Sequence, residues 1–158
     1  MTACPLTPHP SAPWGHLPSK GEADLVTTRK GKTMTYFMIL AMIFAHIVDD
    51  WVLQGKLANF KQRSWWLEVA PDELYKHDYI MALVIHSMSW SFMIHLPLAW
   101  MWFGFDVNLA FVISFVVNAA IHGYVDHLKA NCHKINLVTD QMVHLAQIFV
   151  TAAFFLFV

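Results

Sequence analysis

Charged residues are scarce in this chain, and neither sign dominates among them. Only 13% of the 158 residues are Asp, Glu, Lys or Arg, whereas 57% are hydrophobic, and the formal net charge is −1. An average soluble domain carries about 25% charged residues, so this chain lacks the polar surface of a water-soluble protein. It also has no basic stripe, which excludes nucleic acid as a partner. The two cysteines, Cys4 and Cys132, form no CxxC motif and leave the redox compartment open.

Four long apolar segments stand where a soluble chain would carry charge. A helix that spans a bilayer needs roughly 20 mostly apolar residues. The first segment is a poor signal peptide, because a long polar stretch precedes it and no small-residue cleavage site follows it. Buried helices of a soluble all-α protein are the alternative, but four such segments exceed what a soluble core of this length uses. The sequence therefore predicts an all-α polytopic membrane protein, with four transmembrane helices in an antiparallel bundle at 34–53, 79–103, 107–130 and 138–158.

The segments between these helices differ in composition. Residues 1–33 hold five of the seven prolines and are expected to form a disordered leader, so that 34–158 is the transmembrane domain. The connection at 55–78 contains Trp65 and Trp66, whose side chains suit the headgroup layer, and it is expected to be interfacial.

Histidine and aspartate recur four residues apart on three of the four predicted helices. Residues at i and i+4 share one helix face, so each pair can point two polar groups at one place. The remaining helix contributes one histidine. With a rise of 1.5 Å per residue, all seven side chains fall within roughly 3–12 Å of the same membrane interface. The predicted metal ligands are His46, Asp50, His86, His122, Asp126, Asp140 and His144.

Metal binding is the interpretation that best explains this set. An ionisable side chain at a helix centre costs about 2.5–3.5 kcal/mol on insertion scales, so such groups are rarely idle. A single His–Asp pair is more often a hydrogen bond on a helix surface; three pairs at one depth favour a metal. Imidazole and carboxylate together suit Zn, with Mn and Fe as alternatives. Seven ligands exceed the need of one zinc, which points to two ions that share carboxylates.

Neighbouring polar residues receive lesser roles. His95 lies roughly 13 Å farther along its helix than His86 and is predicted to lie outside the site. His127 and Asp49 are about 100° from the ligand faces and are second choices. Side-chain amides are expected to orient the carboxylates, although Asn118 and Gln147 fit interhelical hydrogen bonds better. The amides assigned to the site are Gln54, Gln141 and Asn118.

The motifs "AHIVDDWVLQ", "HGYVDHLKA" and "DQMVHL", with a histidine in the second helix, support a resemblance. Together they resemble an uncharacterised family of small four-helix membrane proteins from bacteria and phages with HxxxD, H, HxxxD and DQxxH motifs. The match covers residues 34–158 and implies a shared site but no activity. More distantly, the His/Asp helices are similar to metal-dependent hydrolases of the inner membrane. The matched positions are His46, Asp50, Trp51, Leu53, Gln54, His122, Asp126, Lys129, Asp140, Gln141 and His144.

Three functions stay open at this point. The first is a metal-dependent hydrolase that acts on a lipid or membrane-associated phosphate or ester, with a site near one leaflet. The second is a non-enzymatic membrane binding or scaffold protein, in which a structural metal or polar knot holds the helices. The third is a proton or ion pathway, against which the nearly uncharged opposite half of the bundle argues. The expected partners are the lipid bilayer and a lipid substrate, and a homo-oligomer is compatible with the sequence.

Positive charges in short loops mark the cytoplasmic face of a membrane protein. The first and third connections carry six Lys or Arg residues, and the leader carries four. This count favours the bacterial inner membrane with the site in the cytoplasmic leaflet and both termini outside. The leader's charges oppose this orientation, and the conflict would vanish if Met34 were the start. The six are Lys56, Lys61, Arg63, Lys76, Lys129 and Lys134.

Overall fold

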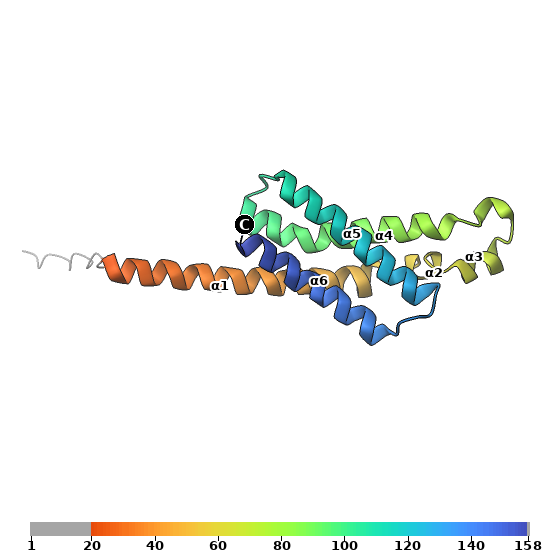
Figure 1. Cartoon of the computed structure of the whole chain (residues 1–158), viewed down its shortest axis with the longest axis horizontal. Coiled ribbons are helices and arrows are strands. Elements are labelled where there is room, and N and C mark those ends of the chain that lie inside the picture. The colour runs from red at the N-terminus through yellow and green to blue at the C-terminus, as the bar shows by residue number, and fades with distance from the viewer. Residues whose placement is uncertain (1–19, 158) are drawn as a thin grey trace, which may run out of the picture. The chain divides into compact units, whose positions relative to one another are not determined.

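The structure, a computed structural model, describes residues 20–157, and all regular elements in this range are helical (Figure 1). Four helices are long and apolar enough to cross a membrane, which confirms the number predicted from the sequence. They are Gly31–Leu53, Glu73–Phe103, Leu109–Ala130 and Leu137–Phe157.

The first and the second of these long helices each end in a π-helical segment. Three short helices lie in the chain between the first π-helical segment and the start of α4. In chain order the elements are α1 (Lys20–Ile47), the π-helix η1 (Val48–Leu53), α2 (Leu57–Phe60), α3 (Arg63–Val69), the 3₁₀-helix η2 (Glu73–Tyr75), α4 (Asp78–Leu98), the π-helix η3 (Ala99–Phe103), α5 (Leu109–Ala130) and α6 (Leu137–Phe157).

The chain divides into two compact units between Thr33 and Met34. The first unit contains the start of α1, so residues 20–33, predicted to belong to a disordered leader, are helical. The last proline of the predicted leader is Pro18, so no proline ring blocks a helix that begins at Lys20. Residues 1–19, the rest of the predicted leader, lie outside the described range. The second unit carries the polar residues that the sequence singled out.

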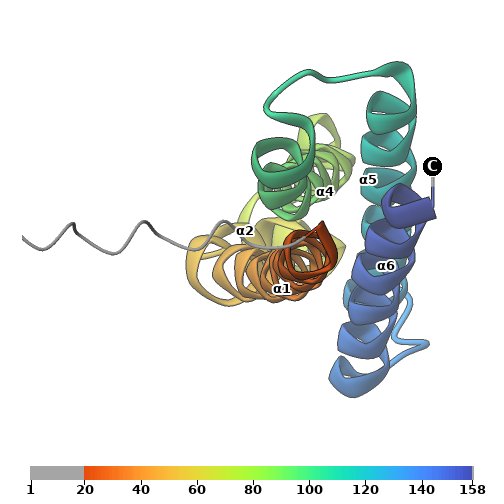
Figure 2. The same cartoon turned by 90° about the vertical axis from the view of Figure 1, so that its left-hand side faces the viewer.

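Helix α4 is the centre of the second unit. It contacts η1, α2 and α3 and packs against α5, while α5 packs in turn against α6 (Figure 2). At one point α4 and α5 approach closely, because a Cβ atom on Gly123 would lie only 2.5 Å from Ser87 Oγ. The Ser87 hydroxyl is itself held, since it donates to the carbonyl of Leu83 at 2.5 Å. Gly123 thus sets the separation of the two helices next to His86 and His122.

On every long helix the apolar core residues lie on one side, along the helix axis, of the histidine predicted as a ligand. In α1 and α5 the core residues precede His46 and His122, whereas in α4 and α6 they follow His86 and His144. The bundle is therefore divided along its length into an apolar half and a polar half. The core residues on these four helices are Met38, Met42, Trp90, Ile94, Leu98, Phe111, Ile148, Ala152 and Phe155.

Large apolar side chains are exposed on the outer surface of this unit, and polar ones are buried inside it. Phe44, Phe92 and Val150 are 67%, 57% and 68% exposed, whereas Asp126 and Asp140 are 1% and 0% exposed. A water-soluble protein buries its large apolar side chains and exposes its carboxylates. The surface of this unit suits a hydrocarbon environment instead.

Candidate metal centre

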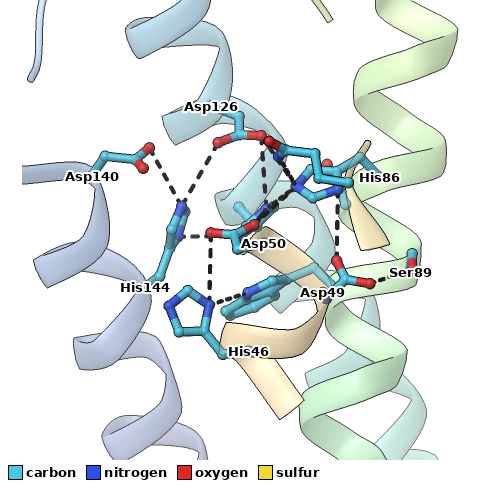
Figure 3. Close-up of polar contacts among 12 residues, drawn as sticks. His46, Asp49, Asp50, His86, Ser89, Asp126, Asp140 and His144 are labelled. Carbon is cyan, nitrogen blue, oxygen red and sulfur yellow. Dashed lines mark hydrogen bonds and ion pairs between the residues drawn. The ribbon is translucent and has the colours of Figure 1, made fainter. Parts of the chain in front are cut away.

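The structure brings all seven predicted ligands together in the polar half of the bundle (Figure 3). Hydrogen bonds and ion pairs of 3.1–3.8 Å link them across four helices. Asp126 is central, because its two carboxylate oxygens face different histidines: Oδ2 lies 3.4 Å from His86 Nε2, and Oδ1 lies 3.8 Å from His144 Nε2. We call this group, together with the aspartate and two lysines introduced next, the His/Asp cluster.

The π-helix η1 adds Asp49 to the cluster. Neighbouring residues of an α-helix point about 100° apart, so Asp49 and Asp50 were expected on different faces. In η1 both contact His86, with Asp49 Oδ2 3.6 Å from Nδ1 and Asp50 Oδ1 3.1 Å from Nε2. Ser89 Oγ holds Asp49 by donating to its Oδ1 at 2.6 Å. Insertions of this kind in α-helices are frequent at functional sites.

Four ligand atoms surround one point that we call the His86 position: Asp50 Oδ1, His86 Nε2, His122 Nε2 and Asp126 Oδ2. Distances of 3.1–3.8 Å join five of the six pairs of these atoms. Tetrahedral ligands about 2.0–2.1 Å from a zinc ion lie roughly 3.4 Å from one another. The donor set and its spacing therefore fit a zinc-like ion.

Three further atoms converge on a second point, the His144 position. They are His144 Nε2, Asp126 Oδ1 and Asp140 Oδ1, and the nitrogen lies 3.8 Å and 3.4 Å from the two oxygens. All three atoms are buried, and none has a hydrogen-bond partner among the residues that the structure describes. These two nitrogen–oxygen distances exceed the 2.7–3.2 Å of an N–H···O hydrogen bond and match the distances between ligands of one metal ion.

The hydrogen-bond partners of His144 indicate which of its ring nitrogens carries the proton. Gln147 Nε2 donates to the carbonyl of Asn118 at 3.1 Å, so Gln147 Oε1 is the atom that accepts from His144 Nδ1 at 3.2 Å. A neutral His144 with its proton on Nδ1 directs the lone pair of Nε2 toward two carboxylate oxygens. Three buried acceptors that face one another are compensated either by a metal cation between them or by a second proton on His144.

Two lysines enter the cluster, and each makes its shortest contact with the Oδ2 atom of one aspartate. Lys61, from the first connection, is 3% exposed and pairs with Asp126. Lys129 Nζ lies 2.5 Å from Asp140 Oδ2, and its side chain is 28% exposed. Lys129 Nζ also lies 3.6 Å from Asp126 Oδ1, which is beyond hydrogen-bond distance, so the Oδ1 atoms of the His144 position accept no hydrogen bond from either lysine.

His46 was predicted to be a ligand, but both of its ring nitrogens are already hydrogen-bonded. Trp90 Nε1, which can only donate, lies 2.8 Å from His46 Nδ1. His46 Nε2 therefore carries the proton and donates to Gln141 Oε1 at 3.1 Å. Gln141 Nε2 in turn donates to Asp50 and Asp140 at 3.1 Å each. His46 thus orients two carboxylates through Gln141 and does not itself offer a free ligand atom.

The three amide side chains assigned to the site differ in what they contact. Gln141 contacts two carboxylates directly, as expected, and Gln54 Nε2 lies 3.3 Å from His86 Nε2. Asn118 orients no carboxylate; it bonds Gln147 and Thr151 of α6, the interhelical hydrogen bonds that fitted it better, and Ser114 of its own helix. Asn118 lies one turn before His122 and contacts α6 at Gln147. Gln147 in turn contacts His144, so it lies between Asn118 and the cluster.

The remaining histidines of the helices lie apart from the cluster. His95, predicted to be outside the site, contacts the Ser91 carbonyl at 2.8 Å and Ser114 Oγ at 3.0 Å. His127, a second choice, stacks on Tyr79 with ring centroids 6.2 Å apart.

Lys61, Lys129 and Trp90 were not predicted to belong to the site, although Lys129 is among the positions matched by the resemblance. Lys129 follows Asp126 by three residues and shares its helix face, so the same spacing rule that found the ligands could have included it. Lys61 comes from a connection 65 residues before its partner, and no local pattern marks it. Trp90 follows His86 by four residues, which places both on one face of α4, and it stacks on His122 with ring centroids 4.2 Å apart.

No family model, curated protein or solved structure matches this chain. The resemblance to the phage and bacterial family therefore stays a prediction, and the case for function depends on the site itself.

Proposed function

We propose that the chain is an integral membrane protein whose four long helices form an antiparallel bundle. The apolar outer surface and the buried carboxylates support insertion into a bilayer. The alternating order of core residues and histidines supports the antiparallel arrangement, because it places the polar half of every helix at the same end. The bacterial inner membrane, with the cluster in the cytoplasmic leaflet, is the location that the loop charges favour.

We further propose that the His/Asp cluster binds a divalent metal ion at the His144 position. The observation that carries this proposal is the convergence there of three buried ligand atoms that have no hydrogen-bond partner among the described residues. Charge supports it: with neutral histidines, four aspartates and two lysines leave a net charge of −2, which one divalent ion neutralises. Zinc suits a site of imidazole and carboxylate, with Mn and Fe as alternatives.

The reaction that this site supports best is hydrolysis of a phosphate or ester on a lipid. Catalytic zinc sites use three protein ligands and keep a further coordination position open, as the His144 position would. A divalent ion there supplies Lewis acidity, which polarises a phosphoryl or acyl oxygen and acidifies a coordinated water. Lys61 and Lys129 hold the carboxylates of Asp126 and Asp140 through their Oδ2 atoms, and the Lys129 side chain, 28% exposed, leads from this position to the surface.

Elemental analysis tests the metal proposal. Wild-type protein purified in mild detergent, loaded with zinc and freed of excess by gel filtration, is expected to contain one ion per chain. His144→Ala should lose it because the only nitrogen ligand of the position is gone. His95→Ala removes an equally buried histidine outside the cluster and should retain the ion. A wild-type protein without stoichiometric metal would leave His144 as a protonated imidazolium between two carboxylates, and the proposal would fail.

Catalysis is tested separately with vesicles that contain phosphatidic acid or a long-chain ester. Turnover that zinc supports, and that is lost both on chelation and in His144→Ala, is the expected result. One bound ion without turnover on either lipid would favour the scaffold function, in which the ion is structural and holds the four helices together.

A proton pathway is the second candidate, because a file of hydrogen bonds extends the cluster into the apolar half. It runs from His144 to Gln147 at 3.2 Å, from Gln147 to Asn118 at 3.3 Å, from Asn118 to Ser114 at 3.4 Å and from Ser114 to His95 at 3.0 Å. Proton flux in proteoliposomes that both His86→Ala and His95→Ala abolish would support it. Beyond His95 the series of hydrogen bonds ends at packed aromatic side chains, which offer a proton no further acceptor. We therefore prefer hydrolysis. The aromatic residues are Phe103, Phe111 and Phe155.

Cysteine labelling tests the orientation in the membrane. Cys132 lies in the third connection, is exposed and is free, so accessibility alone decides its reaction. In a Cys4→Ser background, an impermeant maleimide is expected to leave Cys132 unlabelled in intact spheroplasts and to label it once the membrane is opened. Ready labelling from outside would place the cluster in the opposite leaflet.

A further inference from the structure

We propose that Lys61 is a built-in cation that closes the His86 position to a second divalent ion, and that entry of this ion releases the first connection. This inference rests on the proposed metal-binding function and concerns the regulation of the same site. It explains why a cluster with ligands for two ions also contains two lysines.

Lys61 occupies one of the four ligand atoms of the His86 position. Its ammonium pairs with Asp126 Oδ2, the same oxygen that lies 3.4 Å from His86 Nε2 and 3.8 Å from His122 Nε2. A divalent ion that used this oxygen would meet the ammonium at short distance, where two positive charges repel strongly in a buried site. Lys61 and an ion at the His86 position therefore exclude each other.

The backbone around Lys61 is fixed to the end of α5. Asn131, at the C-terminus of this helix, donates from Nδ2 to the Lys61 carbonyl at 3.0 Å and accepts from the Arg63 amide at 2.7 Å. Lys61 also caps α2, since its amide donates to the Leu57 carbonyl at 3.0 Å. Because Lys61 is only 3% exposed, rotation of its side chain alone would not bring the ammonium into solvent, so its departure from Asp126 disturbs the connection that buries it.

That disturbance would reach the aromatic residues of the connection. Phe60 precedes Lys61, and its ring lies 4.8 Å from that of Trp65, while its carbonyl accepts from Trp66 Nε1 at 2.8 Å. Departure of Lys61 therefore pulls on α2 and α3 together, which joins the state of the cluster to the segment with the exposed side chains of Leu67 and Val69.

Charge defines two states of the cluster. With both lysines paired, the net charge is −2, and one divalent ion at the His144 position brings it to zero. With both lysines displaced, four aspartates carry −4, and two divalent ions again bring it to zero. Two ions with both lysines in place would leave +2 in a buried site, which is unfavourable. Lys129 leaves more easily, because its side chain is 28% exposed; Lys61 is thus the residue that separates the two states.

Metal stoichiometry of a Lys61 variant tests the proposal. At a zinc concentration where the wild-type protein binds one ion per chain, Lys61→Met should bind two. Lys61→Arg keeps the charge and should stay at one, as should Lys56→Met, which removes an exposed lysine of the same connection. One ion in Lys61→Met, or two ions in Lys61→Arg, at this concentration would overturn the proposal while leaving the proposed metal binding intact. Absence of metal from both proteins would instead refute the proposed function.

A measurement on the wild-type protein keeps the proposal testable if Lys61→Met does not fold. An amine-reactive reagent followed by mass spectrometry should leave Lys61 unmodified in the one-ion protein. At zinc concentrations that load two ions per chain, modification of Lys61 should rise at least about tenfold, whereas that of exposed Lys56 should not change. Lys61 that stays protected with two ions bound, or that reacts with one, would contradict the mechanism.

Discussion

Replacement of Asp126 by alanine is expected to lower the free energy of unfolding by about 3–5 kcal/mol, because it removes one partner of a buried ion pair and leaves the other uncompensated. Lys61 would then be a buried ammonium without its carboxylate, and His86 and His122 would lose a neighbouring oxygen. The same change removes a ligand atom from both metal positions. Denaturation with SDS in mixed micelles measures the loss in stability, and elemental analysis the loss of zinc.

Two further variants separate these effects. Asp106→Ala removes an exposed aspartate from the connection before α5 and should change the free energy of unfolding by less than about 0.5 kcal/mol. In the double variant Asp126→Ala, Lys61→Met, the unpaired ammonium is gone, so much of the stability should return, but zinc binding should not. If Asp126→Ala alone were as stable as wild type, Lys61 could not be paired with it as described.

Zinc is expected to raise the stability of the wild-type protein by an amount set by its free concentration. An ion that binds only the folded state stabilises it by about 2.7 kcal/mol at 100 times Kd and about 4.1 kcal/mol at 1,000 times Kd. The effect should be specific for the folded site, because its ligands Asp126, Asp140 and His144 come from α5 and α6 and come together only when these helices pack against each other. Thermal unfolding in detergent, with free zinc buffered by a chelator, measures it.

The histidine variants provide the comparison for this measurement. In His144→Ala the stabilisation by zinc should disappear, since the His144 position loses its nitrogen. His95→Ala should be less stable at every zinc concentration yet should respond to zinc as the wild type does. An equal zinc response in His144→Ala and wild type would mean that the ion binds elsewhere.

The sequence predicted well whatever depends on spacing along a single helix. Four apolar segments gave four long helices, and the four-residue spacing of His and Asp was enough to foresee that His122 and Asp126 share a face. Even the convergence of separate helices could be anticipated, because depth in a membrane is counted from the same interface on each helix. The rejection of His95 followed from the same count.

Other features depend on contacts between distant segments or on local departures from α-helical geometry. Trp90 satisfies His46 across 44 residues of sequence and turns an expected ligand into an orienting residue. Asp49 joins the cluster only because η1 departs from the α-helical period. Lys61 enters from a connection whose path no periodicity describes. Each of these changes the role of a residue without changing the helix that carries it.

The pairing of lysines with aspartates inside the bundle also bears on the order of events during biogenesis. An isolated Asp or Lys at the centre of a membrane helix costs about 2.5–3.5 kcal/mol on insertion scales, and no zinc need be present when the helices enter the bilayer. Lys129 meets Asp140 from the neighbouring helix, and Lys61 meets Asp126 as the first connection closes. These internal counter-ions allow the helices to assemble while part of the aspartate charge is already compensated. Metal loading can therefore follow membrane insertion as a separate step, with the apoprotein as a folded intermediate.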